Sequence, residues 1–226
     1  MIALVIQRTA TFTVAEVYTM AQTVDPTKER SIIFDNLSKI SDLSMAGVVK
    51  LNQLLEYGDK DSLIKLTLPK IPKFTTDELI TVARSAYNSG DTVAISYFGQ
   101  LSDFTPANAV KLAGVLDGGN KDQVVSAWFS RNASVTTSQL ISLSAASYNQ
   151  QSSALINQVT KVSDLTVTNA ISLSRRLDGG DKDTFLMKAV ALATDLSSAN
   201  LITLANEAYS RRDAVLQAGI NRLAGH

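Results

Sequence analysis

The chain has 226 residues, of which 45% are hydrophobic, so it is long enough to bury a substantial core. Its 21 basic residues balance 21 acidic ones, which excludes a strongly basic protein that attracts nucleic acid through net charge alone. The sequence has no cysteine, and its one histidine is His226, which excludes a disulfide framework, thiolate metal sites and catalysis by cysteine.

The first ten residues contain a short apolar run from Ile2 to Ile6, followed by Arg8. A signal peptide has the opposite order, with basic residues before the apolar run. No stretch approaches the roughly 20 apolar residues that a membrane-spanning helix needs. We therefore expect residues 1–10 to form an N-terminal apolar segment, and we expect a cytoplasmic protein with no membrane partner.

From residue 11 onward the sequence repeats itself. Three similar segments begin at Asp42, Asp103 and Asp164, which sets a 61-residue period, and the second and third agree at 11 of 20 positions. A second kind of segment lies between them, as in FTTDELITVARSAYNSGD from Phe74. The two kinds alternate as seven units of about 30 residues, which begin near residues 11, 42, 74, 103, 134, 164 and 195.

Each unit has the pattern of a helical hairpin. A serine or threonine at the start of the first helix offers a hydroxyl to an unpaired backbone N–H, and a capping-box partner follows three residues later at Glu16, Glu78 and Gln139. The expected caps are Thr13, Ser44, Thr75, Thr105, Thr136, Thr166 and Ser197. Each cap follows an apolar residue, and another apolar residue stands five positions after that one, which is the pattern of a hydrophobic staple.

Glycines and aspartates mark the turn between the two helices of alternate units. We expect Gly58, Gly119 and Gly180 to adopt the left-handed conformation that ends the first helix. We expect the aspartate three residues after each glycine to cap the second helix, and these residues are Asp61, Asp122 and Asp183. Apolar residues recur at helical spacing in both helices, with Leu51, Leu112, Leu173, Leu204 and Trp128 at expected core positions.

Short hairpins with one apolar face bury that face only by stacking on neighbours. The sequence therefore predicts an all-α protein in which residues 11–226 form a single α-solenoid domain of about seven helical hairpins, with a period of about 30 and a super-period of about 61 residues. In this respect it resembles the α-solenoid helical-hairpin repeat proteins as a broad class. The resemblance is architectural, and it implies no particular functional residues.

Two repeated features suggest sites, and each also has a structural explanation. The turns at Asp117 and Asp178 offer oxygen ligands, but they lack the glycine and glutamate positions of a calcium loop, so we expect no metal site. Tyr87, Tyr148 and Tyr209 recur with the same 61-residue period. Such aromatic residues can stack on bases, but packing between hairpins is the interpretation we favour.

Arginines provide the remaining candidates for a binding site. Basic pairs at Arg175 with Arg176 and at Arg211 with Arg212, together with Arg84, are suited to phosphate or carboxylate groups, although a solvated surface is the interpretation we favour. No catalytic motif is present, so we expect no enzyme and no cofactor.

The leading hypothesis for the function is a protein-binding scaffold or adaptor that contacts another protein, or a second copy through a terminal repeat. The alternatives are a helical-repeat protein that binds single-stranded RNA, and a structural subunit of a viral or cellular assembly.

Overall fold

A computed structural model describes residues 10–225, so the predicted apolar segment from Ile2 to Ile6 and His226 lie outside the described residues. The described chain forms two compact units, one ending at Phe104 and the other beginning at Thr105. It contains fourteen α-helices, and within residues 10–225 there is no β-strand. The predicted all-α class is confirmed. None of the described helices has the length and apolar character that crossing a bilayer requires.

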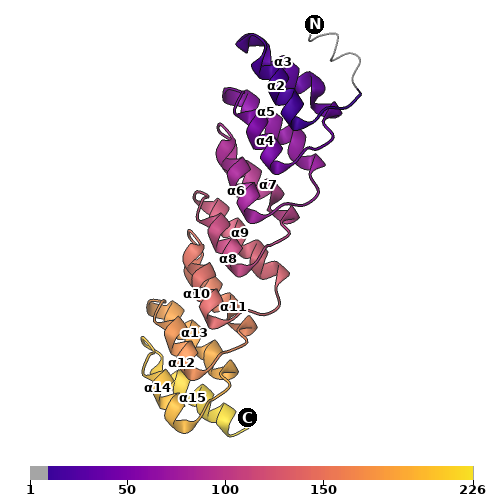
Figure 1. The fold of residues 1–226 in the computed structure, drawn as a ribbon. Coiled ribbons are helices and arrows are strands. Elements are labelled where there is room, and N and C mark those ends of the chain that lie inside the picture. Colours follow the sequence, from indigo (N-terminus) through magenta and orange to yellow (C-terminus); the bar gives the residue numbers. More distant parts are fainter. Residues whose placement is uncertain (1–9, 226) are drawn as a thin grey trace. The chain divides into compact units, whose positions relative to one another are not determined.

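The first unit contains three pairs of consecutive helices (Figure 1). The first helices of the pairs contact one another in the order α2, α4, α6, while α3 packs on α2, α5 on α4 and α7 on α6. Short 3-10 helices follow α3, α5 and α7, at Leu37–Lys39, Leu68–Lys70 and Phe98–Gln100. The helices are α2 (Val14–Gln22), α3 (Pro26–Asn36), α4 (Met45–Asn52), α5 (Tyr57–Thr67), α6 (Thr76–Ser85) and α7 (Gly90–Tyr97).

The second unit continues the same alternation with four pairs. Its first helices contact in the order α8, α10, α12, α14, and among the second helices α11 contacts α13 and α13 contacts α15. A 3-10 helix at Val159–Lys161 follows α11. The helices are α8 (Pro106–Ala113), α9 (Gly119–Arg131), α10 (Thr137–Ala146), α11 (Gln151–Gln158), α12 (Val167–Ser174), α13 (Gly179–Leu192), α14 (Ser198–Ala205) and α15 (Arg212–Leu223).

All seven predicted N-caps are confirmed. The hydroxyl of each cap accepts a hydrogen bond from the backbone N–H three residues later, and the reciprocal capping box forms at Thr13, Thr75 and Thr136. Pro106 occupies the first position of α8, where the helix needs no N–H donor. The seven helix starts are therefore fixed by interactions between residues that are close in sequence.

The glycine prediction is wrong by one residue. At these three turns the positive φ angles belong to Tyr57 (44°), Gly118 (46°) and Gly179 (46°), each one residue before the predicted glycine. The first helices end several residues earlier, for example at Asn52 and Ala113, so the positive φ angle sets the start of the second helix instead of the end of the first. Glycine suits this position because it has no Cβ, and Tyr57 shows that a side chain is tolerated there.

The core consists of the apolar stripes of both helices. Leu51, Leu112, Leu173 and Leu204 are completely buried, as predicted, and Trp128 is 3% exposed. In the first unit, the hairpins pack through a continuous cluster that includes Val17, Ile33, Leu51 and Leu63. Burial of such side chains stabilises each helix pair against its neighbours, because short helices are marginal alone.

Candidate functional site

Three aspartates on second helices accept hydrogen bonds from the backbone just after the first helix of the next hairpin. The carboxylates of Asp61, Asp122 and Asp183 each accept a 2.8 Å hydrogen bond from a backbone N–H of the following hairpin, and a second bond comes from the next residue along. The donors of the 2.8 Å bonds belong to Tyr87, Tyr148 and Tyr209. The prediction that these aspartates cap their own helices is therefore wrong. They join one hairpin to the next, across 26 residues of sequence.

Hydrogen bonding lowers the pKa of two of these carboxyls. Burial raises the pKa of Asp61, but hydrogen bonds from the hydroxyl of Ser89 and the N–H of Tyr87 outweigh this effect and hold that pKa below its ordinary value. The pKa of Asp183 is lowered in the same way, because hydrogen bonds from the hydroxyl and N–H of Ser210 outweigh the opposing effect of burial.

A second set of aspartates binds the N-terminus of the preceding hairpin. Asp42 accepts a 2.6 Å hydrogen bond from the N–H of Val14, the first residue of α2, and equivalent bonds run from Thr76 to Asp103, from Thr137 to Asp164 and from Val167 to Asp195. A carboxylate is favoured there because unpaired N–H groups give a helix N-terminus partial positive charge. Sequence reasoning found three of these residues as repeat markers and missed their role.

The repeated tyrosines are exposed, which contradicts the favoured interpretation that they pack between hairpins. The exposed fractions are 52% for Tyr87, 56% for Tyr148 and 73% for Tyr209. Their backbone N–H groups are held by the aspartates of the preceding hairpins. The helical pattern suggested burial, but each tyrosine follows the end of its first helix, at a position where the helical period no longer applies.

Aromatic contact and surface shape vary around these tyrosines. In the first unit Tyr57 is also exposed, at 65%, and its ring meets that of Tyr87 edge to face at a centroid distance of 5.5 Å. In the second unit, Tyr148 borders a shallow depression of about 480 Å³ whose lining includes Gly114 and Ala145. The tyrosines thus lie at the surface on a backbone fixed by hydrogen bonds.

The structure brings only some of the arginine candidates near a partner group. Arg175 forms two hydrogen bonds with the carboxylate of Glu207, at 2.6 and 3.2 Å, and this pair holds the pKa of Glu207 below its ordinary value. Arg176, Arg211 and Arg212 are exposed in the same unit. Arg84 is exposed near the end of α6 in the first unit, so the five arginines are divided between the two units.

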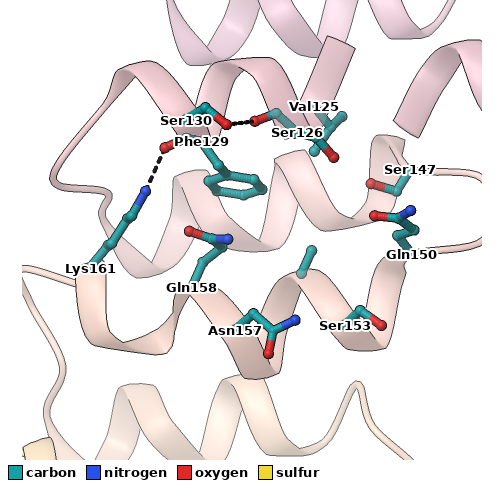
Figure 2. A pocket seen from close by; sticks show the side chains of 11 residues that line it. Val125, Ser126, Phe129, Ser130, Ser147, Gln150, Ser153, Asn157, Gln158 and Lys161 are labelled. Carbon is teal, nitrogen blue, oxygen red and sulfur yellow. Dashed lines mark hydrogen bonds between the residues drawn. The ribbon is translucent and has the colours of Figure 1, made fainter. Parts of the chain in front are cut away.

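A basic side chain also recurs at the end of the second helices. Lys161 donates from Nζ to the carbonyl oxygens of Phe129 and Asn132 at the end of α9, as Figure 2 shows for Phe129. Arg222, one full period later, donates to the carbonyls of Val190 and Ala193 at the end of α13. These two side chains donate hydrogen bonds to unpaired backbone carbonyls at helix C-termini. Sequence reasoning also missed this structural role.

Within residues 10–225 no group of three or more acidic or histidine side chains is arranged to hold a metal ion. Comparisons with protein-family models, curated proteins and solved structures found no match. The exposed tyrosines on their anchored backbone are therefore the repeated surface feature on which a functional argument rests.

Proposed function

We propose that this chain is a non-enzymatic, cytoplasmic scaffold that binds another protein through the exposed tyrosines of its repeats. The proposal includes an α-solenoid of seven helical hairpins, since the 61-residue period continues across residue 104 without a gap. Such arrays offer extended, modular surfaces to a partner. The sequence contains no cysteine, so the fold does not depend on an oxidising compartment.

The observation that carries the proposal is the position of Tyr87, Tyr148 and Tyr209. Tyrosine is enriched among the residues that dominate binding energy in protein interfaces. Its rigid ring provides a large contact area, and its hydroxyl group can form a hydrogen bond. A residue needed only for packing would be buried, whereas these three are more than half exposed. Their repetition would let one extended partner contact successive hairpins.

A terminal repeat is a second surface of the same proposal. On the last helix Val215 is buried, but Ile220 and Leu223 are 53% and 44% exposed, and Ile202 on α14 is 52% exposed. We therefore include contact with another protein, or with a second copy of this chain, through α14 and α15. Association that depends on concentration, and that Ile220→Ser abolishes, would identify the second copy.

The test is quantitative capture of partners from extract of the source cells, followed by reconstitution with the purified partner. The triple variant Tyr87→Ser, Tyr148→Ser, Tyr209→Ser should weaken binding at least about 30-fold, because a single interface anchor contributes about 2 kcal/mol or more. Leu66→Ser is the control, since Leu66 is similarly exposed, at 50%, but belongs to α5 and not to the repeated tyrosine positions.

Two results would contradict the proposal. Binding that survives the triple variant and falls with Leu66→Ser would place the interface elsewhere. Capture that disappears on ribonuclease treatment and falls steeply with added salt would favour the alternative, binding of single-stranded RNA. In that case Arg211→Ala should weaken binding. The pairing of Arg175 with Glu207 is the observation that makes RNA the second choice.

A further inference from the structure

The shallow depression beside Tyr148 lies between α8 and α10 in the second unit and has a volume of about 480 Å³. We call it the α8–α10 depression. Its lining is mostly apolar, and Gly114, Ala145 and Tyr148 are exposed, so a partner group can reach them. Val110 adds a half-buried apolar side chain. Lys121, near the start of α9, is the one charged residue among the described residues of the lining.

One period later, two charged side chains join the ends of the equivalent helices, α12 and α14. Arg175 donates two hydrogen bonds to the carboxylate of Glu207, at 2.6 and 3.2 Å. The residues at these positions in the earlier pair of helices are Gly114 and Ala146, which have no group to form such a pair. Both line the α8–α10 depression. The depression therefore lies where the later interface holds an ion pair.

The equivalent helices of the first unit, α4 and α6, are also joined by polar side chains. Asn52 donates from Nδ2 to the carbonyl and hydroxyl oxygens of Ser85, at 2.8 and 3.1 Å. The four positions concerned read Asn-Gln and Arg-Ser in this pair and Ser-Arg and Asn-Glu in α12–α14, but Ala-Gly and Ala-Ala in α8–α10. Of the three equivalent pairs of first helices, α8–α10 alone has no polar side chain at these positions.

Lysine is nevertheless kept at this place, as Lys121 and as Lys182 one period later. Hydrogen bonding from Arg175 lowers the pKa of Glu207 most, against the effect of burial, and the positive charge of Lys182 lowers it further. Lys121 has the neutral Ala146 instead of that carboxylate, and within the described residues its ammonium group forms no ion pair. The α8–α10 depression thus combines an apolar surface with a cation that lacks a counter-charge.

We propose that the α8–α10 depression binds a peptide segment of the partner in which an acidic residue neighbours an apolar one. The inference rests on the proposed binding of a protein through the repeated tyrosines, because Tyr148 borders the depression. The partner's carboxylate pairs with Lys121, and its apolar side chain packs on Val110 and Ala145 beside the tyrosine ring. One cation on an apolar surface favours such a segment over RNA, which is usually bound through several phosphate contacts.

The test is titration of the full chain with blocked peptides, followed by amide chemical shifts. The probes are acetyl-Ala-Leu-Glu-Ala amide and acetyl-Ala-Glu-Leu-Ala amide, each with its glutamine analogue, at up to about 20 mM, which detects millimolar affinities. We expect saturable shifts at residues 110–121 and 142–151 with at least one glutamate peptide. Its glutamine analogue should bind about fivefold more weakly, because it cannot form the ion pair with Lys121.

Matched variants follow from the internal repeat. With Lys121→Gln, the glutamate and glutamine peptides should bind equally, because the coupling between the two charges is removed. Lys182→Gln is the control and should keep the fivefold preference, since the interface beside it is already filled by an ion pair. Gly114→Arg with Ala146→Glu copies that ion pair into the α8–α10 depression and should abolish the saturable shifts. Thermal unfolding verifies that each variant is folded.

Three results would overturn this proposal. The first is the absence of saturable shifts, or equal affinity of the natural chain for glutamate and glutamine peptides. The second is larger shifts at the same amides with hexauridylate, which would favour RNA as the occupant. The third uses the purified partner protein, whose binding Lys121→Gln should weaken about fivefold. Binding that falls with the triple tyrosine variant but not with Lys121→Gln would overturn this inference and leave the proposed function in place.

Discussion

The hairpin of α10 and α11 and the hairpin of α14 and α15 occupy equivalent places in the 61-residue period, yet they differ in what they present. Both begin with a hydroxyl N-cap, both bury a leucine at Leu143 or Leu204, and both carry an exposed tyrosine after the first helix, held by a buried aspartate. Between these fixed points, α11 carries Ser153, Asn157 and Gln158, where α15 carries alanine or glycine. The shared residues are those that the fold needs, and the others are free to take on a function.

The largest effect is expected where the two hairpins agree, in the buried leucines. Leu143→Ala and Leu204→Ala should each lower the free energy of unfolding by about 2 to 5 kcal/mol, because each removes a completely buried side chain and leaves a cavity. Urea denaturation measures the loss, and hydrogen exchange should rise first in the adjacent hairpins. Exchange that rises evenly along the chain would contradict coupling between nearest neighbours.

Substituting the aspartates that bind the tyrosine N–H groups should destabilise the two hairpins by different amounts. Asp183 accepts from the N–H of Tyr209 and from both the N–H and hydroxyl of Ser210, whereas Asp122 accepts from the N–H groups of Tyr148 and Asn149. Asp183→Ala should therefore cost about 2 to 4 kcal/mol and Asp122→Ala about 1 kcal/mol less, because hydrogen bonds to charged groups contribute most. Equal losses in urea denaturation would contradict the difference.

Acid provides a second measurement on Asp183. Its pKa is lowered in the folded chain, so the stability that it contributes is complete above the ordinary carboxyl pKa of about 4 and is lost as pH falls below that value. The difference in unfolding free energy between the natural chain and Asp183→Ala should therefore shrink between about pH 5 and pH 3. A difference that stays constant over this range would show that the bonds do not depend on the ionised carboxylate.

A smaller effect tests the close packing of α15 on α14. Gly219→Ala should lower the free energy of unfolding by about 1 to 3 kcal/mol, since the added methyl group meets Leu201. Gln158→Ala, at the equivalent position of α11, should change stability by less than about 0.5 kcal/mol, because its side chain lines a groove between α9 and α11. Thermal unfolding of both variants measures the contrast, and a destabilising Gln158→Ala would mean that this glutamine supports the fold.

Much of this fold could be predicted from the sequence because it depends on local interactions. All seven N-caps, the three capping boxes and the four core leucines depend on residues within a few positions of one another, and each was predicted correctly. The hydrogen bonds of Asp61, Asp122 and Asp183 to the tyrosine N–H groups span 26 residues. Nothing in a local pattern indicates such a partner, which is why these aspartates were misassigned.

The same distinction applies to the candidate sites. Spacing identified Tyr87, Tyr148 and Tyr209 as repeated, but spacing alone does not tell a buried position from an exposed one where a helix ends. The arginine pairs were chosen by residue type, and the partner of Arg175 lies 32 residues away at Glu207.

The two families of aspartate also define where this chain tolerates gain or loss of a segment. Removing residues 103–163, one full period, would bring Asp164 to the place of Asp103 and Asp183 to the place of Asp122, so each retained carboxylate meets the kind of N–H group it binds now. Deleting a single hairpin would instead join two hairpins of the same kind, and a carboxylate would lose the N–H groups that it binds now. We therefore expect this chain to tolerate the loss of a whole period better than the loss of a single hairpin.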